Sequence, residues 1–460
     1  MTVAAESPHA LDAGRGGSDV ATRIERLPMT GYQRKLFAVI ASAWLVDQID
    51  VALLTFLLGS IIAAFDLTPV QAGQLAATTF AGQLVGNVLA GAASDRFGRR
   101  AVFQVTMVVW GLASLGAAAA WSLTALMVFR FLIGVGVGGE APVAQAMVSE
   151  IVPARVRGKY IAIMEGCWAI GYVLSGAISF FVLPLLGWRW AFVIVGLLSL
   201  VVLLVRRAMP ESPRWLAETG RHAEAEAAVA AMEAEVTRRT GVPLPPVPPQ
   251  APAGPVDRRN PVAVLFSPGY RRRTAMAFGL WFFALIGFFG LNSWIAVLLR
   301  ERGFTDVGSV GFVTLITVGG IPGFAVAAVL LERIGRKPTT ALFLVCAAGA
   351  AYLYGTAGDR TALLVNGFVM QFFMFGMWSC LYAYTPELYP TRARSTGAGF
   401  ASAVGRVGAI LGPQIVPVLV RDHGPAAAFQ VGAGGFLIAA VLVLVLGVET
   451  KGRVLESLSR

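Results

Sequence analysis

Long apolar runs, separated by short polar loops, set the pattern of this chain. A run of about 18 or more apolar residues is long enough to cross a bilayer as an α-helix. Twelve such runs occur, at 35–64, 71–93, 101–120, 123–151, 159–184, 189–207, 273–299, 306–331, 338–356, 361–389, 396–419 and 426–447. We therefore predict an all-α membrane protein whose twelve transmembrane helices form two six-helix halves.

Polar segments outside these runs divide the chain into five regions. We expect an N-terminal tail at 1–34, a first half at 35–207, a linker at 208–272, a second half at 273–447 and a C-terminal tail at 448–460. The first tail contains no short apolar stretch ending in a cleavage site, so we expect no removable signal peptide.

The linker is the only sizeable polar insertion. Its Ala/Glu/Arg-rich stretch at 221–238 predicts a surface helix, and its Pro-rich tract at 243–249 favours extended chain. It is either a simple tether between the halves or a cytoplasmic clamp that stabilises one conformation.

Two motifs recur with one offset of 237 residues. Asp95-Arg-Phe-Gly-Arg-Arg returns as Glu332-Arg-Ile-Gly-Arg-Lys, and Glu150-Ile-Val-Pro-Ala-Arg-Val-Arg returns as Glu387-Leu-Tyr-Pro-Thr-Arg-Ala-Arg. A shared offset indicates a duplicated unit, and parallel repeats of membrane helices place a substrate site between the two halves.

Basic residues gather in alternate loops. Groups of Arg and Lys follow the second, fourth, eighth and tenth runs, whereas the loops between them hold at most two basic residues. Because cytoplasmic loops are enriched in Lys and Arg, both termini and the linker are expected in the cytoplasm. The predicted location is the cell membrane, inner or plasma.

Composition supports the membrane interpretation and excludes several other classes. The chain is 56% hydrophobic and 14% charged, whereas soluble domains carry about 25% charged residues. The net charge is +11, and the Lys and Arg residues lie in tails and loops. This distribution is typical of the loops of a membrane protein and does not indicate a nucleic-acid partner. Cys167, Cys346 and Cys380 show no paired spacing, so neither a disulfide framework nor a zinc site is expected. No nucleophile–base pattern, phosphate loop or cofactor motif is visible, so we expect no enzyme, cofactor or metal.

Ionisable residues within the runs are the first functional candidates, because a charge at mid-membrane is costly and usually marks a pathway or an ion pair. Arg406 lies near the middle of the eleventh run, and its planar guanidinium suits a bidentate contact with a carboxylate. The alternative is a structural ion pair with an acid on a neighbouring helix.

Two acids of the first run, Asp47 and Asp50, are three residues apart and share one helix face. Either could carry a coupling proton, because a carboxyl is neutral when sealed from water and ionised near a cation such as Arg130 on the fourth run. Alternatively, an acid–arginine pair only locks the helices together.

Further acids and loop charges are candidates for gating. Glu140 and Glu165, towards the cytoplasmic side of the fourth and fifth runs, would pair with arginines that hold that side shut. The charges of the repeated loops would form inter-helix latches, which close when the protein opens outward and separate when it opens inward. These are Asp95, Arg99, Arg100, Glu150, Arg155, Glu332, Arg336, Glu387 and Arg392.

Aromatic and amide side chains at helical spacing are candidates for the wall of a substrate pocket. They are Phe288 and Asn292 on the seventh run, Gln371, Trp378 and Tyr382 on the tenth, and Trp168 and Tyr172 on the fifth. Core packing or lipid contact explains each aromatic equally well. The two amides are the stronger candidates, because an amide in hydrocarbon needs a hydrogen-bond partner.

Several motifs in register resemble the major facilitator superfamily, in its sugar-porter-related branch, over residues 35–455. They are the two repeated motifs, Arg130-Phe-Leu-Ile-Gly-Val-Gly, Pro210-Glu-Ser-Pro-Arg and Val448-Glu-Thr-Lys-Gly. The seventh run lacks the paired glutamines of sugar porters, and Gly287-Phe-Phe-Gly-Leu-Asn-Ser-Trp resembles bacterial niacin transporters, aromatic-acid/proton symporters and animal organic-ion transporters.

The resemblance implies roles for four charged residues. Asp50 and Arg130 match the acid–arginine pair of proton-coupled sugar porters, and Asp47 matches the additional acid of aromatic-acid symporters. Arg406 occupies the position of an arginine that meets anions in organic-anion members of the group.

The resemblance thus implies a proton-coupled secondary transporter that imports a small organic monocarboxylate, nicotinate or a related aromatic acid, by alternating access. Its partners would be the organic anion, protons and the lipid bilayer, and we expect a monomer. The alternatives are a sugar, polyol or organic-cation transporter or a drug exporter of the same fold. A non-transporting nutrient sensor is the alternative from another class.

Overall fold

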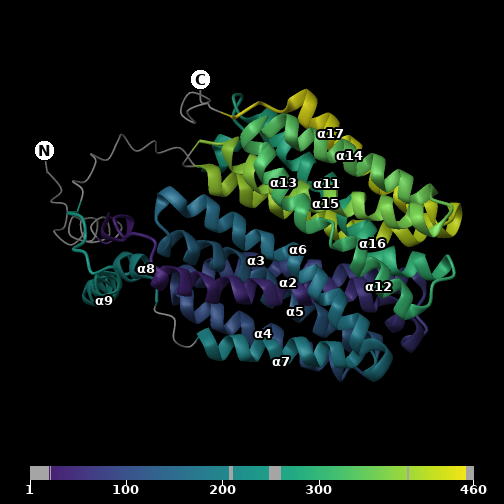
Figure 1. Cartoon of the computed structure of the whole chain (residues 1–460), viewed down its shortest axis with the longest axis horizontal. Helices are drawn as coiled ribbons and strands as arrows, with labels where there is room; N and C mark the ends of the chain where they lie inside the picture. Colours follow the sequence, from purple (N-terminus) through teal and green to yellow (C-terminus); the bar gives the residue numbers. More distant parts are fainter. Residues whose placement is uncertain (1–19, 21, 207–210, 248–260, 391–392, 452–460) are drawn as a thin grey trace, which may run out of the picture.

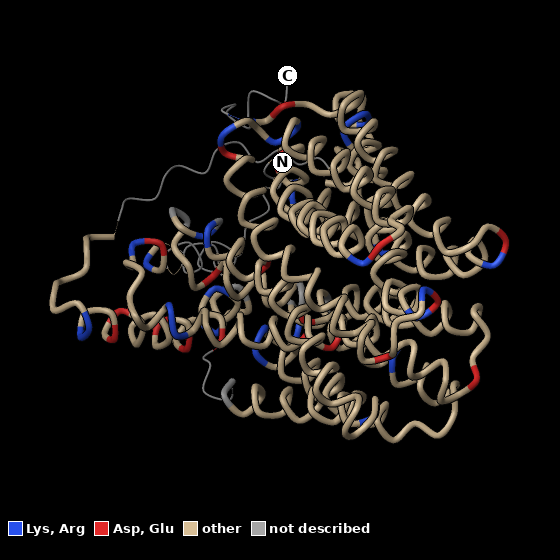
Figure 2. The backbone as a smooth tube through the Cα atoms, turned by 45° about the vertical axis from the view of Figure 1, so that its right-hand side comes forward, with Lys and Arg blue, Asp and Glu red and all other residues tan. Residues whose placement is uncertain are grey.

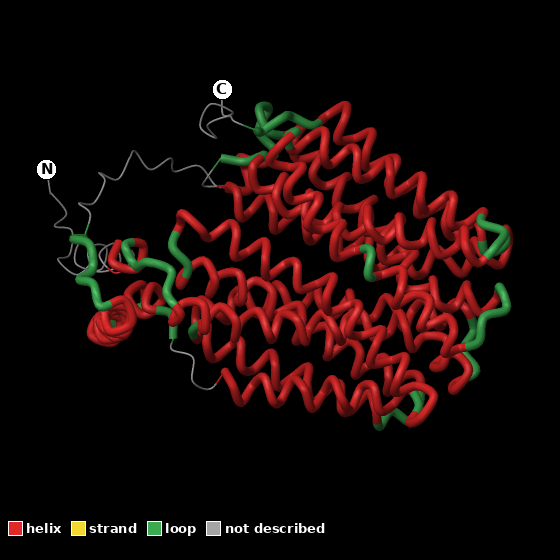
Figure 3. The backbone as a smooth tube through the Cα atoms, in the orientation of Figure 1, coloured by secondary structure: helices red, strands yellow, loops and turns green. Residues whose placement is uncertain are grey.

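The structure, a computed structural model, describes residues 20, 22–206, 211–247, 261–390 and 393–451. Throughout this described part the regular secondary structure is helical, and Figure 3 shows the long helices running side by side. The predicted all-α class is therefore confirmed.

The first half consists of six long helices. They are α2 (Gly31–Phe65), α3 (Pro69–Phe97), α4 (Arg99–Ala118), α5 (Leu123–Ile151), α6 (Ala154–Leu186) and α7 (Trp188–Arg206). Helix α2 begins before the apolar run because Thr30 and Gln33 form a capping box at its start. It ends at Asp66, which adopts the left-handed conformation with φ 49°.

The second half repeats this order with one helix divided. Its helices are α11 (Arg271–Glu301), α12 (Asp306–Thr317), α13 (Gly320–Arg333), α14 (Arg336–Thr356), α15 (Arg360–Glu387), α16 (Arg394–His423) and α17 (Ala426–Leu446). The predicted eighth span is α12 and α13 together, interrupted at Val318 and Gly319. A Cβ at Gly319 would lie 2.6 Å from the carbonyl oxygen of Phe368, so the break brings two backbones together.

Every predicted span coincides with helix, but the described part does not confirm that all twelve cross a membrane. Ten segments are long and apolar enough to do so, with α12 and α13 counted together. Helix α3 is not among these ten, and α7 counts as a shorter apolar helix over its described part, Trp188–Leu204.

The same helix pairs pack together in each half. The contacts of α2 with α6, α3 with α5 and α4 with α7 have counterparts in α11 with α16, α13 with α15 and α14 with α17. Figure 1 shows the first half below and the second half above, with their long axes side by side. This correspondence is the structural expression of the duplication in the sequence.

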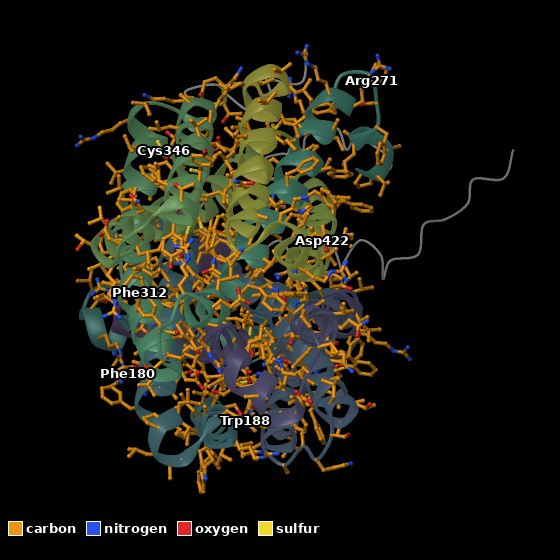
Figure 4. The ribbon with its side chains drawn as sticks, turned by 90° about the vertical axis from the view of Figure 1, so that its right-hand side faces the viewer. Phe180, Trp188, Arg271, Phe312, Cys346 and Asp422 are labelled. Atoms are coloured by element: carbon orange, nitrogen blue, oxygen red, sulfur yellow. The ribbon has the colours of Figure 1, made fainter. Side chains whose placement is uncertain are left out.

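The two halves touch through α2 with α11, α3 with α16 and α6 with α12. The rings of Phe80 and Phe289 lie 4.3 Å apart, and a Cβ at Gly311 would lie 2.7 Å from the ring of Phe180. Figure 4 shows Phe180 and Phe312 near one another at the edge of the bundle. We call the end of the bundle that faces the viewer in Figure 4 the distal end; the start of α2 and the end of α17 lie at the opposite, terminal end.

The linker contributes α8 (Pro213–Glu218), α9 (His222–Thr240) and α10 (Pro261–Leu265). Helix α9 agrees with the surface helix predicted at 221–238. Lys, Arg, Asp and Glu concentrate on α9 and at helix ends, while the long helices are mostly free of them (Figure 2). Part of the Pro-rich tract, from residue 248 onward, lies outside the described residues.

The chain before α2 packs on the linker. Val20 and Ile24 join a small apolar cluster with Ala225 and Val229 of α9. This contact ties the N-terminal segment to the element that connects the halves.

Candidate functional site

A small cavity lies between the two halves. Seven helices supply its walls, four from the first half and three from the second. We call it the central cavity, and it is lined by Trp44, Gln48 and Val51 of α2, Gln83 of α3, Val137 and Gly138 of α5, Glu165 and Trp168 of α6, Phe289 of α11, Trp378 and Tyr382 of α15, and Arg406 of α16.

Arg406 supplies the positive charge of the central cavity. Its Nη1 donates to Oε1 of Gln83 at 2.5 Å, so the bond crosses from the second half to the first. It forms no ion pair with an acid of the described part, although the charge of Glu165 acts on it. The structure thus places Arg406 in the wall of the cavity, where its partner is a neutral amide; its role in binding a carboxylate stays a prediction.

Glu165 lies in the wall of the same cavity, with 4% of its surface exposed. Its Oε1 accepts a hydrogen bond from the amide of Gln145 at 3.1 Å. The structure places this carboxyl in the wall of the cavity that also holds Arg406, and its gating role stays a prediction. Glu165 and Trp168 are three residues apart, and this spacing places both side chains on one face of α6.

Indole rings form much of the remaining wall. Trp168 and Trp378 meet edge to face, with ring centroids 4.1 Å apart. The indole N–H groups of Trp44, Trp168 and Trp378 have no acceptor among the described residues. A buried N–H group without an acceptor is costly, so an atom that accepts hydrogen bonds would be favoured beside these rings.

Four predicted pocket residues do not line the cavity. Phe288 and Tyr172 pack behind Trp168, with ring centroids 5.2 Å and 5.8 Å from it. Gln371 Nε2 donates to Asn292 Oδ1 at 3.0 Å, and both amides are almost fully buried. This bond joins α11 to α15, and Asn292 Nδ2 donates in turn to the backbone carbonyl of Phe288 at 3.1 Å.

The predicted acid–arginine pair is present but lies outside the cavity lining. Arg130 Nη1 is 3.2 Å from Asp50 Oδ1, and both side chains are almost completely buried. The guanidinium of Arg130 also lies 5.7 Å from the ring centre of Phe192 on α7. Asp47 is buried on the same helix and does not line the cavity either.

The loop charges link helices within one half. Arg99 lies 3.7 Å from Glu150, which ties α4 to α5. The equivalent Arg336 lies 3.0 Å from Glu387, which ties α14 to α15. The predicted inter-helix contacts thus exist at the terminal end; their opening and closing remain a prediction.

The other gating candidates have varied positions. Glu332 pairs with Arg336 at 2.9 Å, and Glu140 is buried within α5. The backbone N–H of Arg100 donates to Oε1 of Glu211 at 3.0 Å. The side chains of Asp95 and Arg155, and the whole of Arg392, lie outside the described residues.

Two acids at equivalent positions close the repeated loops, and the sequence analysis assigned them no role. Glu211 lies against Gly98, and Glu449 lies against Gly335, whose φ values are +96° and +107°. Burial raises the pKa of Glu449, but backbone N–H donors that include Arg336 and Lys337 lower it more, so the net shift is downward. Carboxylates at helix starts are favourable because they accept from unpaired N–H groups.

No cluster of three or more His, Cys, Asp or Glu side chains that could hold a metal ion occurs in the described ranges. The chemistry of the cavity is therefore that of a guanidinium, a carboxyl, amides and aromatic rings.

Comparison with known proteins finds transporters that match nearly the whole chain. A family model described as sugar (and other) transporter matches residues 49–460. The niacin transporter NiaP of Acinetobacter baylyi is 37% identical over 443 residues, which cover 96% of this chain and 99% of that protein. A putative niacin/nicotinamide transporter of Bacillus subtilis is 33% identical over 425 residues, covering 92% and 98%.

Solved structures show the same fold. The xylose transporter XylE of Escherichia coli, in a partially occluded inward-open conformation, superposes with a TM-score of 0.75 at 18% identity. The match covers 92% of this chain and 100% of that one. The resemblance inferred from the sequence motifs is confirmed by these comparisons.

Proposed function

The chain belongs to the sugar (and other) transporter family of the major facilitator superfamily, and from this we infer that it imports a small aromatic monocarboxylate together with protons. Nicotinate is the substrate that we propose first. Transport proceeds by alternating access, with both termini in the cytoplasm. The relatives and the fold are those of multi-pass membrane transporters and of no catalytic family.

One observation carries the proposal: a guanidinium lines an aromatic cavity between the halves and bonds to a neutral amide. A carboxylate could replace Gln83 at Arg406 without breaking an ion pair, and it would gain charge-assisted hydrogen bonds. The identity of about one third with niacin transporters supports the same substrate class.

The walls of the cavity suit the rest of such a ligand. Trp168, Trp378 and Phe289 can stack on or pack against a flat ring. Trp44 and Tyr382 are the further candidates for polar contact with a ring nitrogen. Asn292, Gln371, Phe288 and Tyr172 are proposed to support this wall from behind.

Proton coupling is proposed for Asp50, with Arg130 as its partner and Asp47 as a neighbouring acid. A buried carboxyl is stable when ionised only while it faces a cation, so separating Asp50 from Arg130 would favour its protonation. The pair lies outside the cavity, so it would link the proton to the arrangement of helices.

Ligand binding to the purified protein tests the substrate. A ligand that binds only the folded state raises the melting temperature, so nicotinate and benzoate should raise it and nicotinamide and xylose should raise it much less. Arg406→Ala and Arg406→Lys should both lose the response to carboxylates, because lysine keeps the charge but not the planar fork.

Two results would contradict the carboxylate role. One is equal stabilisation of the wild type by nicotinate and nicotinamide, and the other is an undiminished nicotinate response in Arg406→Ala. A response to xylose alone would support the sugar-transport alternative.

A further inference from the structure

Glu165 and Arg406 face one cavity from opposite halves and do not form an ion pair. Glu165 accepts from the amide of Gln145 at 3.1 Å, and Arg406 donates to the amide of Gln83 at 2.5 Å. Each charge is therefore held by a neutral partner, while the two charges act on one another through the cavity. The space between them is where a small anion would bind.

We propose that Glu165 is a second proton-binding site of the transport cycle, which takes up a proton when a carboxylate ligand binds to Arg406. The inference rests on the proposed function, since it requires an anionic ligand in the central cavity. The step is a simple protonation, in which the carboxylate of Glu165 becomes a neutral carboxylic acid with a proton from water.

Charge balance supports this coupling. Without ligand, one carboxylate and one guanidinium face the cavity, so its net charge is zero. A bound carboxylate would add a second anion near Glu165, and two like charges are strongly disfavoured where water is largely excluded. Uptake of one proton by Glu165 leaves one anion opposite one cation, and the net charge returns to zero.

Among the described residues, Arg406 is the one cation that acts on Glu165. Helices α7, α12 and α13, which pack on α6, carry charged residues only near their ends. Asp50 of α2 is turned towards Arg130. Other titratable or charged groups lie near Glu165. They are Arg406 and Tyr382 of the second half, Cys167 on α6 itself, and Asp47 and Glu140 on α2 and α5.

The two proposed proton sites therefore differ in what they sense. Asp50 is outside the cavity lining, and its proton would be linked to the separation of helices α2 and α5. Glu165 is inside the lining, and its proton would be linked to the presence of the substrate. A symporter needs both links if the proton and the substrate are to move together.

The pH dependence of ligand affinity tests the inference. We expect the affinity of the full-length wild type for benzoate and nicotinate to fall as the pH rises from about 6 to about 8.5, where both ligands are ionised. The fall approaches tenfold per pH unit where binding takes up one proton. Calorimetry in buffers of different ionisation enthalpy should show uptake of about one proton per ligand.

Variants separate Glu165 from the other acids. Glu165→Gln, which imitates the protonated state, should bind both ligands with an affinity that no longer depends on pH. Glu165→Asp should restore the dependence. The control Asp422→Asn should keep it, since Asp422 lies at the exposed distal end of α16 and pairs with Arg421.

Three results would overturn the inference: a wild-type affinity that is independent of pH, an unchanged dependence in Glu165→Gln, or the loss of carboxylate binding at every pH in that variant. Failure of the wild type to bind any carboxylate would instead contradict the proposed function.

Discussion

Arg130 and Arg406 are both arginines within long membrane helices, yet they have different partners. Arg130 faces the carboxylate of Asp50, whereas Arg406 faces the neutral amide of Gln83. The sequence was sufficient to select both arginines, because a charge within an apolar run is conspicuous. It could not tell which one faces a cavity, because that depends on the rotation of each helix against its neighbours.

The same limit applies to the uncharged wall. Trp168, Trp378 and Tyr382 were predicted and do line the cavity, while Gln48 and Gln83 were missed. The rule that an amide in hydrocarbon needs a partner would have found these glutamines, had it been applied to α2 and α3 as well.

Replacing Asp50 should separate transport from coupling. In Asp50→Asn, uphill accumulation driven by a proton gradient should be lost, while exchange of substrate across the membrane should persist in part because it needs no net proton movement. Asp47→Asn should have the smaller effect. Uptake into proteoliposomes with and without a gradient, beside counterflow, distinguishes these results. Gradient-driven accumulation that survives in Asp50→Asn but not in Asp47→Asn would move the role to Asp47.

Removing one amide of the Asn292–Gln371 pair should affect stability more than binding. Gln371→Leu leaves Asn292 Oδ1 without its donor, which costs about 1 to 3 kcal/mol when the group is buried. In a double-mutant cycle with Asn292→Leu, we expect a coupling energy of about 0.6 to 1.7 kcal/mol. Unfolding in denaturing detergent measures it. Unchanged stability together with lost nicotinate binding would show that the amides contact the ligand after all.

Helix positions followed from the apolar runs, but helix ends and breaks did not. The start of α2 is set by the capping box of Thr30 and Gln33, and the break between α12 and α13 by the close approach of Gly319 to α15. Both depend on local hydrogen bonds or on a neighbouring helix, which an average over an apolar window does not register.

Close packing of α3 on α5 predicts a sharp difference between two glycines of α3. A Cβ at Gly86 would clash with the backbone of Val135, whereas a Cβ at Gly91 would meet nothing within 4 Å. Gly86→Ala should therefore lower the melting temperature, and Gly91→Ala should leave it unchanged or raise it, since alanine is favoured over glycine in helices by about 1 kcal/mol. Equal melting temperatures for the two variants would show that the α3–α5 contact tolerates a larger separation.

The whole molecule is two similar halves joined by a linker that also holds the N-terminal segment. Arg23 and Arg26 both donate to the carboxylate of Glu233 on α9, with shortest distances of 2.8 Å and 2.6 Å. Another ion pair, between Glu25 and Arg157, connects this segment to α6 of the first half. The structure thus gives the linker a contact with the N-terminal segment; the choice between clamp and tether stays a prediction.

Loss of the Glu233 charge should release the N-terminal segment. Hydrogen bonds from Arg23 and Arg26 outweigh the effect of burial and lower the pKa of Glu233 below its ordinary value of 4.5. The stabilisation is therefore complete above that value and is lost as the pH falls through the lowered pKa. Glu233→Gln should mimic the loss at neutral pH and speed trypsin cleavage after Arg23 and Arg26.

Glu235→Gln is the matched control, because the ion pairs of Glu235 within the described part are with Arg238 and Arg239 of its own helix. Equal cleavage rates in both variants would show that the contact of Arg23 and Arg26 with Glu233 does not hold the segment.

Accumulation of labelled nicotinate in proteoliposomes tests the central claim most directly. With an acidic exterior, the wild type should accumulate nicotinate above its passive equilibrium, and a protonophore should abolish the accumulation. Liposomes containing Arg406→Ala report the passive entry of the neutral acid. Unlabelled benzoate should compete, and xylose should not. Accumulation no greater than in the Arg406→Ala liposomes, or competition by xylose and not by benzoate, would contradict the account.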